Sequence, residues 1–167
     1  MSARAGRVAV AVASALGLLV VLLLGATACR QVGYWSDGVR LFEHDLKVTG
    51  QNRFAHFSLA TVFHADGDNQ GAIRHLRAAI RIDPAYVAAR NDLAVVLYEE
   101  GRNAEAIAEL EEVLRLSPVN SRAHTDLGIA LIQENRFDDA IRQFRRALEI
   151  DPGNSKAKAG IEEAERR

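Results

Sequence analysis

The stretch RNDLAVVLYEEGRNAEAIAELEEVLRLSPVN, residues 90–120, decides the fold of this chain. Its apolar and small residues recur at helical spacing on both sides of Gly101, so each half predicts a helix with one apolar face. Pro118 ends the second helix, because proline lacks an N–H and disfavours helical geometry in the residue before it. Too few residues surround Gly101 for anything except a tight turn, and the stretch therefore predicts an antiparallel helix pair.

The same pattern recurs with a period of 34 residues, which is the spacing of the three prolines, Pro84, Pro118 and Pro152. The apolar positions obey the same period: Leu59, Leu93 and Leu127; Ala72, Ala106 and Ala140; Leu76, Leu110 and Phe144. The predicted turns hold Gly67, Gly101 and Asn135, the two residue types that most readily take positive φ at a helix end. The chain therefore predicts three helix hairpins, at 53–86, 87–120 and 121–154.

Both ends of this array extend the pattern. Gly33 and Phe42 fall one period before Gly67 and Leu76, which predicts a degenerate half-repeat over 31–52. A single hairpin does not bury its own apolar faces, so the last one needs a cover. Residues 155–167 predict this capping helix, with Ser155 as its N-cap.

The unit at 90–120, and its neighbours ending RIDP and EIDP, resemble the tetratricopeptide repeat. The resemblance implies an all-α fold, a right-handed superhelical solenoid of antiparallel helix hairpins, whose usual role is to bind other proteins. One departure is that the aromatic residue usual near the start of each first helix is replaced by His56, Arg90 and His124. We expect weaker local packing there.

Such a solenoid has a concave groove lined by its first helices, which suits an extended peptide or a partner helix. The positions expected to line the groove are Phe54, Phe57, Thr61, His64, Ala88, Asn91, Val95, Tyr98, Arg122, Thr125, Ile129 and Ile132. Some members of the family grip the C-terminal carboxylate of chaperones with Lys, Asn and Arg. The nearest positions here are Phe54, Ser58, Asp92, Arg122 and Asp126, so this clamp is mostly absent and partly reversed in charge.

Residues 8–28 form an uncharged run at the N-terminus, about the length that crosses a ~30 Å hydrocarbon core. A cleaved signal usually has an apolar region of only about 7 to 15 residues, so a transmembrane helix or signal anchor over 8–30 is favoured. Cleavage after Ala28 and lipidation of Cys29 remain alternatives. Arg4 and Arg7 predict that residues 1–7 are cytoplasmic and that the repeats lie on the extracytoplasmic side, periplasmic or extracellular.

The stretch CRQVGYWSDGVRLFEHDLKVTGQN, residues 29–52, resembles the junction between the last membrane helix and the repeats in transmembrane tetratricopeptide-repeat O-mannosyltransferases. That resemblance implies a piece of an enzyme whose catalytic core spans the membrane many times. This chain has one expected span and none of the acidic catalytic loops. It would then be the repeat half alone.

Charge and motifs exclude several other classes of function. The 21 basic and 22 acidic residues give a net charge of -1, so we expect no nucleic acid partner. No phosphate loop, nucleophile elbow or metal-ligand cluster is present, and we expect neither an enzyme nor a cofactor. The acidic run of Glu109, Glu111 and Glu112 predicts an exposed helix face, with Arg115 pairing with Glu111.

The sequence therefore predicts a membrane-anchored, non-enzymatic scaffold that binds a protein or peptide in its concave groove. Two alternatives are a detached substrate-binding repeat domain of a membrane glycosyltransferase, and a lipoprotein that helps envelope assembly.

Overall fold

The computed structural model describes residues 42, 46 and 52–167, and in these residues all regular secondary structure is α-helical. The chain divides into two compact units, residues 1–41 and 42–167. The expected cytoplasmic segment 1–7 and membrane helix 8–30 lie outside the described residues, as does nearly all of the half-repeat 31–52. None of the helices in the described part is both long and apolar enough to span a membrane.

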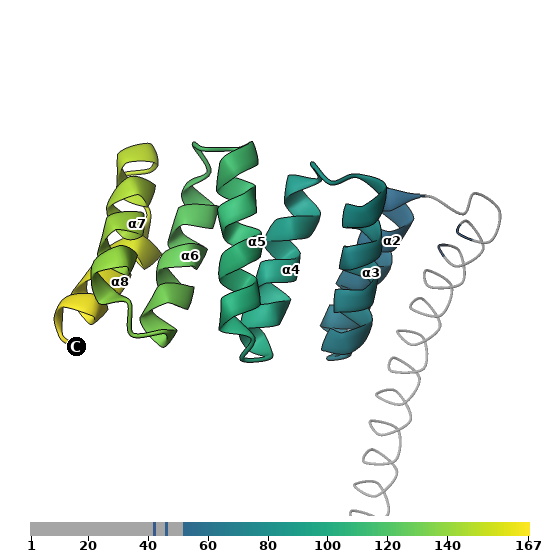
Figure 1. Ribbon diagram of the computed structural model, residues 1–167, viewed down its shortest axis with the longest axis horizontal. Helices are drawn as coiled ribbons and strands as arrows, with labels where there is room; N and C mark the ends of the chain where they lie inside the picture. Colours follow the sequence, from purple (N-terminus) through teal and green to yellow (C-terminus); the bar gives the residue numbers. More distant parts are fainter. Residues whose placement is uncertain (1–41, 43–45, 47–51) are drawn as a thin grey trace, which may run out of the picture. The chain divides into compact units, whose positions relative to one another are not determined.

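Within the second unit, residues 52–167 form three helix pairs followed by one more helix (Figure 1). The helices are α2 (Arg53–Ala65), α3 (Asn69–Ile82), α4 (Val87–Glu99), α5 (Asn103–Leu116), α6 (Ser121–Gln133), α7 (Phe137–Ile150) and α8 (Ser155–Glu165). Each helix packs on its neighbours in sequence, and α8 packs against both α6 and α7. The predicted all-α fold class is confirmed.

The turns within the pairs have the backbone conformation that the sequence predicts. Gly67 has φ 80°, Gly101 has φ 72° and Asn135 has φ 57°, the last being the single non-glycine residue with positive φ in the described part of the chain. Asparagine tolerates this region better than other side chains, so the substitution in the third pair keeps the turn.

The core runs continuously along the array through the small and apolar positions of the 34-residue period. Leu93 and Ala106 are almost completely buried, as are their equivalents in the other pairs. Alanine at 72, 106 and 140 lets the two helices of a pair approach each other closely. The burial predicted from the period is thus confirmed.

Two local predictions are wrong. The N-cap of α8 is Asn154, whose side chain accepts a hydrogen bond from the N–H of Ala157, and Ser155 is the first helical residue. Arg115 pairs with Glu112 at 2.7 Å, one helical step away from the predicted Glu111. Both errors are single-residue shifts, which helical periodicity alone does not resolve.

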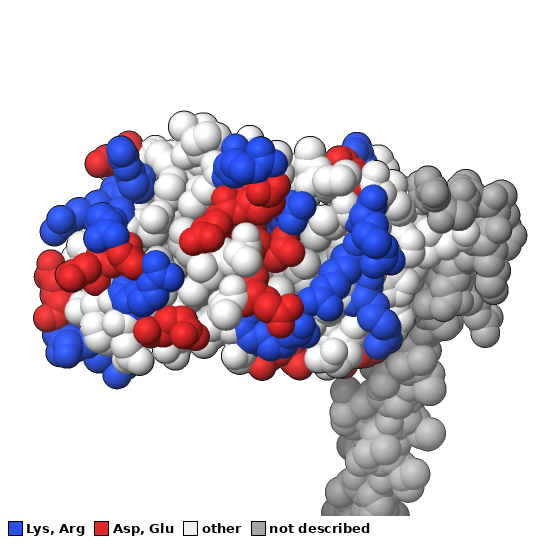
Figure 2. Space-filling view, in the orientation of Figure 1, with Lys and Arg blue, Asp and Glu red and all other residues white. Residues whose placement is uncertain are grey.

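The charged outer face of the helices is organised by pairing between neighbours. Figure 2 shows basic side chains gathered over α3 and acidic side chains over α5. Arg77 on α3 binds Glu105 on α5 at 2.8 Å. Most of these groups are exposed, and such pairs contribute little stability individually. This face is consistent with an ordinary solvated surface.

Candidate functional site

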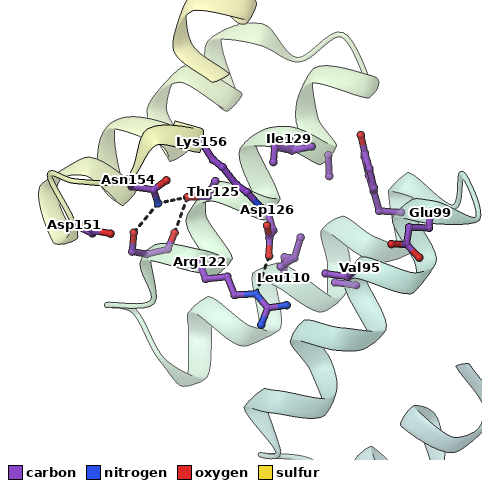
Figure 3. A pocket seen from close by; sticks show the side chains of 14 residues that line it. Val95, Glu99, Leu110, Arg122, Thr125, Asp126, Ile129, Asp151, Asn154 and Lys156 are labelled. Atoms are coloured by element: carbon purple, nitrogen blue, oxygen red, sulfur yellow. Dashed lines mark hydrogen bonds and ion pairs between the residues drawn. The ribbon is translucent and has the colours of Figure 1, made fainter. Parts of the chain in front are cut away.

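A hollow among the described residues lies between α4 and α6 and reaches the start of α8 (Figure 3). We call it the α4/α6 cavity; its volume is about 510 Å³. It is lined by Ala94, Val95, Tyr98, Glu99, Leu110, Ser121, Arg122, Thr125, Asp126, Ile129, Ala130, Asp151, Asn154 and Lys156. The helices α4 and α6 are the equivalent first helices of adjacent pairs.

The α4/α6 cavity contains five of the residues that the sequence predicts for the groove: Val95, Tyr98, Arg122, Thr125 and Ile129. Two more, Thr61 and His64, line a smaller recess between α2 and α4 that also includes Asp92. The predicted positions on three successive first helices therefore contribute to two neighbouring hollows.

The other predicted positions lie elsewhere. Phe54 is 58% exposed, and its ring contacts that of Tyr86 at 6.0 Å between centroids. Phe57 packs against the same tyrosine. Asn91 and Ile132 are only 6% and 8% exposed, and they lie in the packed interior. The helical period places them on the inner edge of the groove face, where contact with the next helix covers them.

The apolar floor of the cavity comes from aliphatic side chains on three helices. Val95 lies on α4, Leu110 on α5 and Ile129 on α6. Buried aliphatic surface of this kind favours binding of an apolar side chain by removing its area from water. The floor therefore favours binding of an apolar group by an interaction that does not depend on charge.

One polar wall of the cavity has its hydrogen bonds satisfied within the protein. The side-chain amide of Asn154 donates to Thr125 Oγ1 at 2.8 Å and to Ser121 Oγ at 3.1 Å. Thr125 Oγ1 in turn donates to the carbonyl of Ser121 at 2.9 Å. This wall is fixed in place and links the beginning of α8 to α6.

The acidic wall is different, because its carboxylate, Asp126, shares one cation with Asp92 of the smaller recess. Arg122 lies 3.4 Å from Asp92 and 3.5 Å from Asp126. Burial raises the pKa of Asp126, while Arg122 opposes this shift and the charge of Asp92 adds to it. Burial also raises the pKa of Asp92, against the opposing effect of Arg122.

Sequence reasoning missed one pairing at the rim of this site. The Nε2 atom of His64 lies 2.7 Å from Glu99 Oε2. The two residues are 35 apart in the sequence and come from adjacent first helices. Their separation, one period plus one residue, is the signal that could have revealed the pair.

Among the residues that the structure describes, no group of three or more His, Cys, Asp or Glu side chains is arranged to hold a metal ion. The arrangement of an apolar floor, a fixed polar wall and an acidic wall is suited to binding a side chain.

Comparison with known families matches this chain to a model of the tetratricopeptide repeat. It covers residues 57–120 and 91–155, which together make up more than half of the chain. No curated protein sequence is similar enough to count as a relative.

Several solved structures share the fold. The structure of MamA has a TM-score of 0.76 and 23% identity, over 82% of this chain and 80% of that one. YrrB, described as a TPR protein with an unusual peptide-binding site, has a TM-score of 0.70 and 20% identity, over 78% and 67% of the two chains.

A third structure is the first TPR domain of Spaghetti, bound to an HSP90 peptide. Its TM-score is 0.67 and its identity 17%, over 70% of this chain and 92% of that one. At these identities the three structures support the fold alone. They give no support to the expected likeness with O-mannosyltransferases, whose junction residues lie almost entirely outside the described part.

Proposed function

Since this chain belongs to the tetratricopeptide repeat family, we propose that it is a protein-interaction module that binds an extended peptide segment of a partner in the α4/α6 cavity. The observation that carries the proposal is the cavity of about 510 Å³ on the face of the first helices, with an apolar floor and polar walls. Two of the similar structures are described as peptide-bound or peptide-binding. We propose no catalytic role.

Site-specific cross-linking tests this function. A photoreactive amino acid is placed at Ile129, in the cavity, in the full-length chain expressed at its normal level in its own cells. The matched control carries it at Arg145, an exposed position of α7 that is not in the lining of the cavity. We expect a defined cross-linked partner from position 129 only. Equal products from both positions, or none from 129, would contradict the proposal.

We also propose that residues 8–30 anchor the module in a membrane, with the repeats on the extracytoplasmic side. The support comes from the sequence: an uncharged run over 8–28, preceded by Arg4 and Arg7. The chain should then remain in the membrane fraction after washing with alkaline carbonate. In intact cells stripped of any outer envelope, added protease should digest the repeats.

Fractionation, fatty-acid labelling and cross-linking together separate the remaining alternatives. Cleavage after Ala28 would release a soluble chain that begins near Cys29. A lipoprotein would incorporate labelled fatty acid, and Cys29→Ala would abolish the label. A detached domain of a glycosyltransferase would cross-link from position 129 to the acceptor proteins of a multi-span enzyme.

A further inference from the structure

The carboxylate of Asp126 is the least satisfied polar group in the wall of the α4/α6 cavity. Its Oδ2 atom is inaccessible to water and has no hydrogen-bond partner in the described part of the chain. The side chain as a whole is only 21% exposed. The nearest cation to this oxygen is Arg122, whose Nε lies 3.5 Å away, so the carboxylate has lost water and gained only a loose ion pair. Such a group is energetically unfavourable, and a closer donor from a ligand would relieve the cost.

The internal cation near this carboxylate is loosely held. Arg122 is 61% exposed, and its distances of 3.4 Å to Asp92 and 3.5 Å to Asp126 are long for ion-paired hydrogen bonds. By contrast, other arginines of this chain approach their carboxylates at 2.7 or 2.8 Å. One guanidinium therefore serves two carboxylates, and it satisfies neither of them fully.

The charges around the cavity are acidic on balance. Asp126, Glu99 and Asp151 line it, and Asp92 adjoins it through Arg122. Against these four carboxylates stand Arg122 and Lys156, while Glu99 also pairs with His64 at 2.7 Å. Figure 3 shows Arg122 directed toward Asp126, with Val95 and Leu110 beside them and Ile129 on the same helix as Asp126. An acidic group thus adjoins aliphatic surface within one cavity.

We propose that the α4/α6 cavity selects peptide segments in which a lysine or arginine lies next to an aliphatic or aromatic residue. This inference rests on the proposed peptide-binding function and names the chemistry of the ligand. The basic side chain displaces the exposed Arg122 and donates to Asp126 in its place, and the apolar neighbour packs on Val95 and Ile129. Because Asp126 is already largely desolvated, the ligand gains the interaction without the protein paying the full desolvation cost again.

Substitutions of Asp126 and Arg122 should change the affinity for a basic peptide in opposite directions. Asp126→Asn keeps the shape of the side chain but removes the charge, and it should weaken binding of a basic peptide by about tenfold or more. Arg122→Gln removes the internal competitor, and it should strengthen binding of the same peptide several-fold. A groove built to bind carboxylates would respond to both changes in the reverse direction.

The probe is a library of peptides of about ten residues, with both ends blocked so that only side chains carry charge. The full-length chain selects binders from the library, and fluorescence anisotropy measures their affinity for each variant. Ile129→Ala removes apolar surface from the cavity without changing its charge, so it tests whether the peptide binds there. Thermal unfolding of every variant shows that it is folded before binding is compared.

We expect selected peptides to pair Lys or Arg with an apolar neighbour, and to bind more weakly as ionic strength rises from about 50 to 300 mM. If the selected peptides are acidic or uncharged but lose affinity on Ile129→Ala, the cavity binds peptides and the inferred charge preference is wrong. If no selected peptide responds to Ile129→Ala, both the inference and the proposed function are wrong.

Discussion

Phe144 is the residue at which the third repeat departs most from the other two. It occupies the position held by Leu76 and Leu110, and it is completely buried. A Cβ atom built on Gly128 would lie 2.5 Å from Cε1 of this ring, and one built on Gly160 would lie 2.4 Å from Cζ. The two glycines therefore make room for the larger side chain.

This packing predicts a specific rescue. Gly128→Ala should destabilise the protein by about 1 to 3 kcal/mol, because the new methyl group overlaps the Phe144 ring. Adding Phe144→Leu restores the Ala and Leu combination of the second repeat, so the double variant should be more stable than the sum of the single changes predicts. Urea unfolding of the four proteins measures the coupling. Additive changes would show that the two residues do not compete for space.

Asp126 gives a prediction about pH. Burial raises its pKa in the folded protein above the ordinary value of 3.8, so the folded state binds a proton more readily than the unfolded state. The ionised carboxylate therefore lowers stability at neutral pH, and the loss is relieved as pH falls through the raised pKa.

We accordingly expect Asp126→Asn to unfold at a higher temperature than the native protein at pH 7. The difference should shrink as pH falls through the raised pKa of Asp126, because the native carboxyl then becomes protonated. Thermal unfolding of both proteins across this range provides the test. A variant that is less stable at pH 7 would mean that the interaction with Arg122 outweighs burial.

At the scale of single elements, polar contacts within each helix pair take the place of the aromatic packing that is usual in the family. His56 meets His75, Arg90 meets Glu109 and His124 meets Gln143, each pair separated by 19 residues. The sequence shows directly that the usual aromatic residue is missing. It does not show which side chain each replacement residue contacts, because that depends on the rotation of the second helix. These contacts recur with the 34-residue period, and they link the first and second helices of all three repeats.

The start of α8 is tied to α6 by one side chain. Asn154 caps α8 through the N–H of Ala157, and its amide also donates to Thr125 and Ser121. Asn120, one period earlier, caps α6 in the same way through Ala123. The sequence predicts a helix here but not this cross-link, because the hydroxyl partners are about 30 residues away.

We expect Asn154→Ala to cost about 1 kcal/mol for the cap and about 1 kcal/mol more for the lost hydrogen bonds to α6. Asn154→Ser keeps a capping oxygen, so it should lose only the stability that comes from the hydrogen bonds to α6. Asn120→Ala, the matched control, should lose only a cap. Chemical denaturation measures the free energy of unfolding of the three variants. Equal losses in all of them would show that Asn154 does not stabilise the contact between α8 and α6.

At the scale of the whole molecule, each helix pair is stabilised by the next. Ala157 and Ala164 of α8 are 0% and 5% exposed, and Gly160 lies against Phe144. The helix α8 therefore covers the face that α6 and α7 would otherwise present to water. In such an array, the effect of losing one unit should decay with distance along the stack.

Deleting residues 155–167 tests this view. We expect lower stability, with the largest increase in amide hydrogen exchange in α6 and α7 and the smallest in α2 and α3. Exchange followed by mass spectrometry resolves the helices. A uniform increase over all of them would instead indicate a single cooperative unit.

The repeat period predicts most of this fold. Leu, Ala, Gly and Pro at fixed positions specify the helices, the close approach of the two helices within a pair, and the turns. The cavity was harder to predict. Val95, Arg122 and Ile129 follow from the helical face, whereas Lys156 and Asp151 enter only because α8 and the end of α7 approach α6. The burial of Asn91 and Ile132 depends on the angle between neighbouring helices, which the sequence does not specify.

The most direct test of the account is to map a bound peptide by NMR on the full-length chain, purified in mild detergent, with labelled methyl groups. The peptide is the tightest binder from the selection described above. Shifts centred on Val95, Leu110 and Ile129, with little change on α3 and α7, are the predicted result. Shifts confined to α3, α5 or α7, or spread evenly over the array, would contradict binding in the α4/α6 cavity.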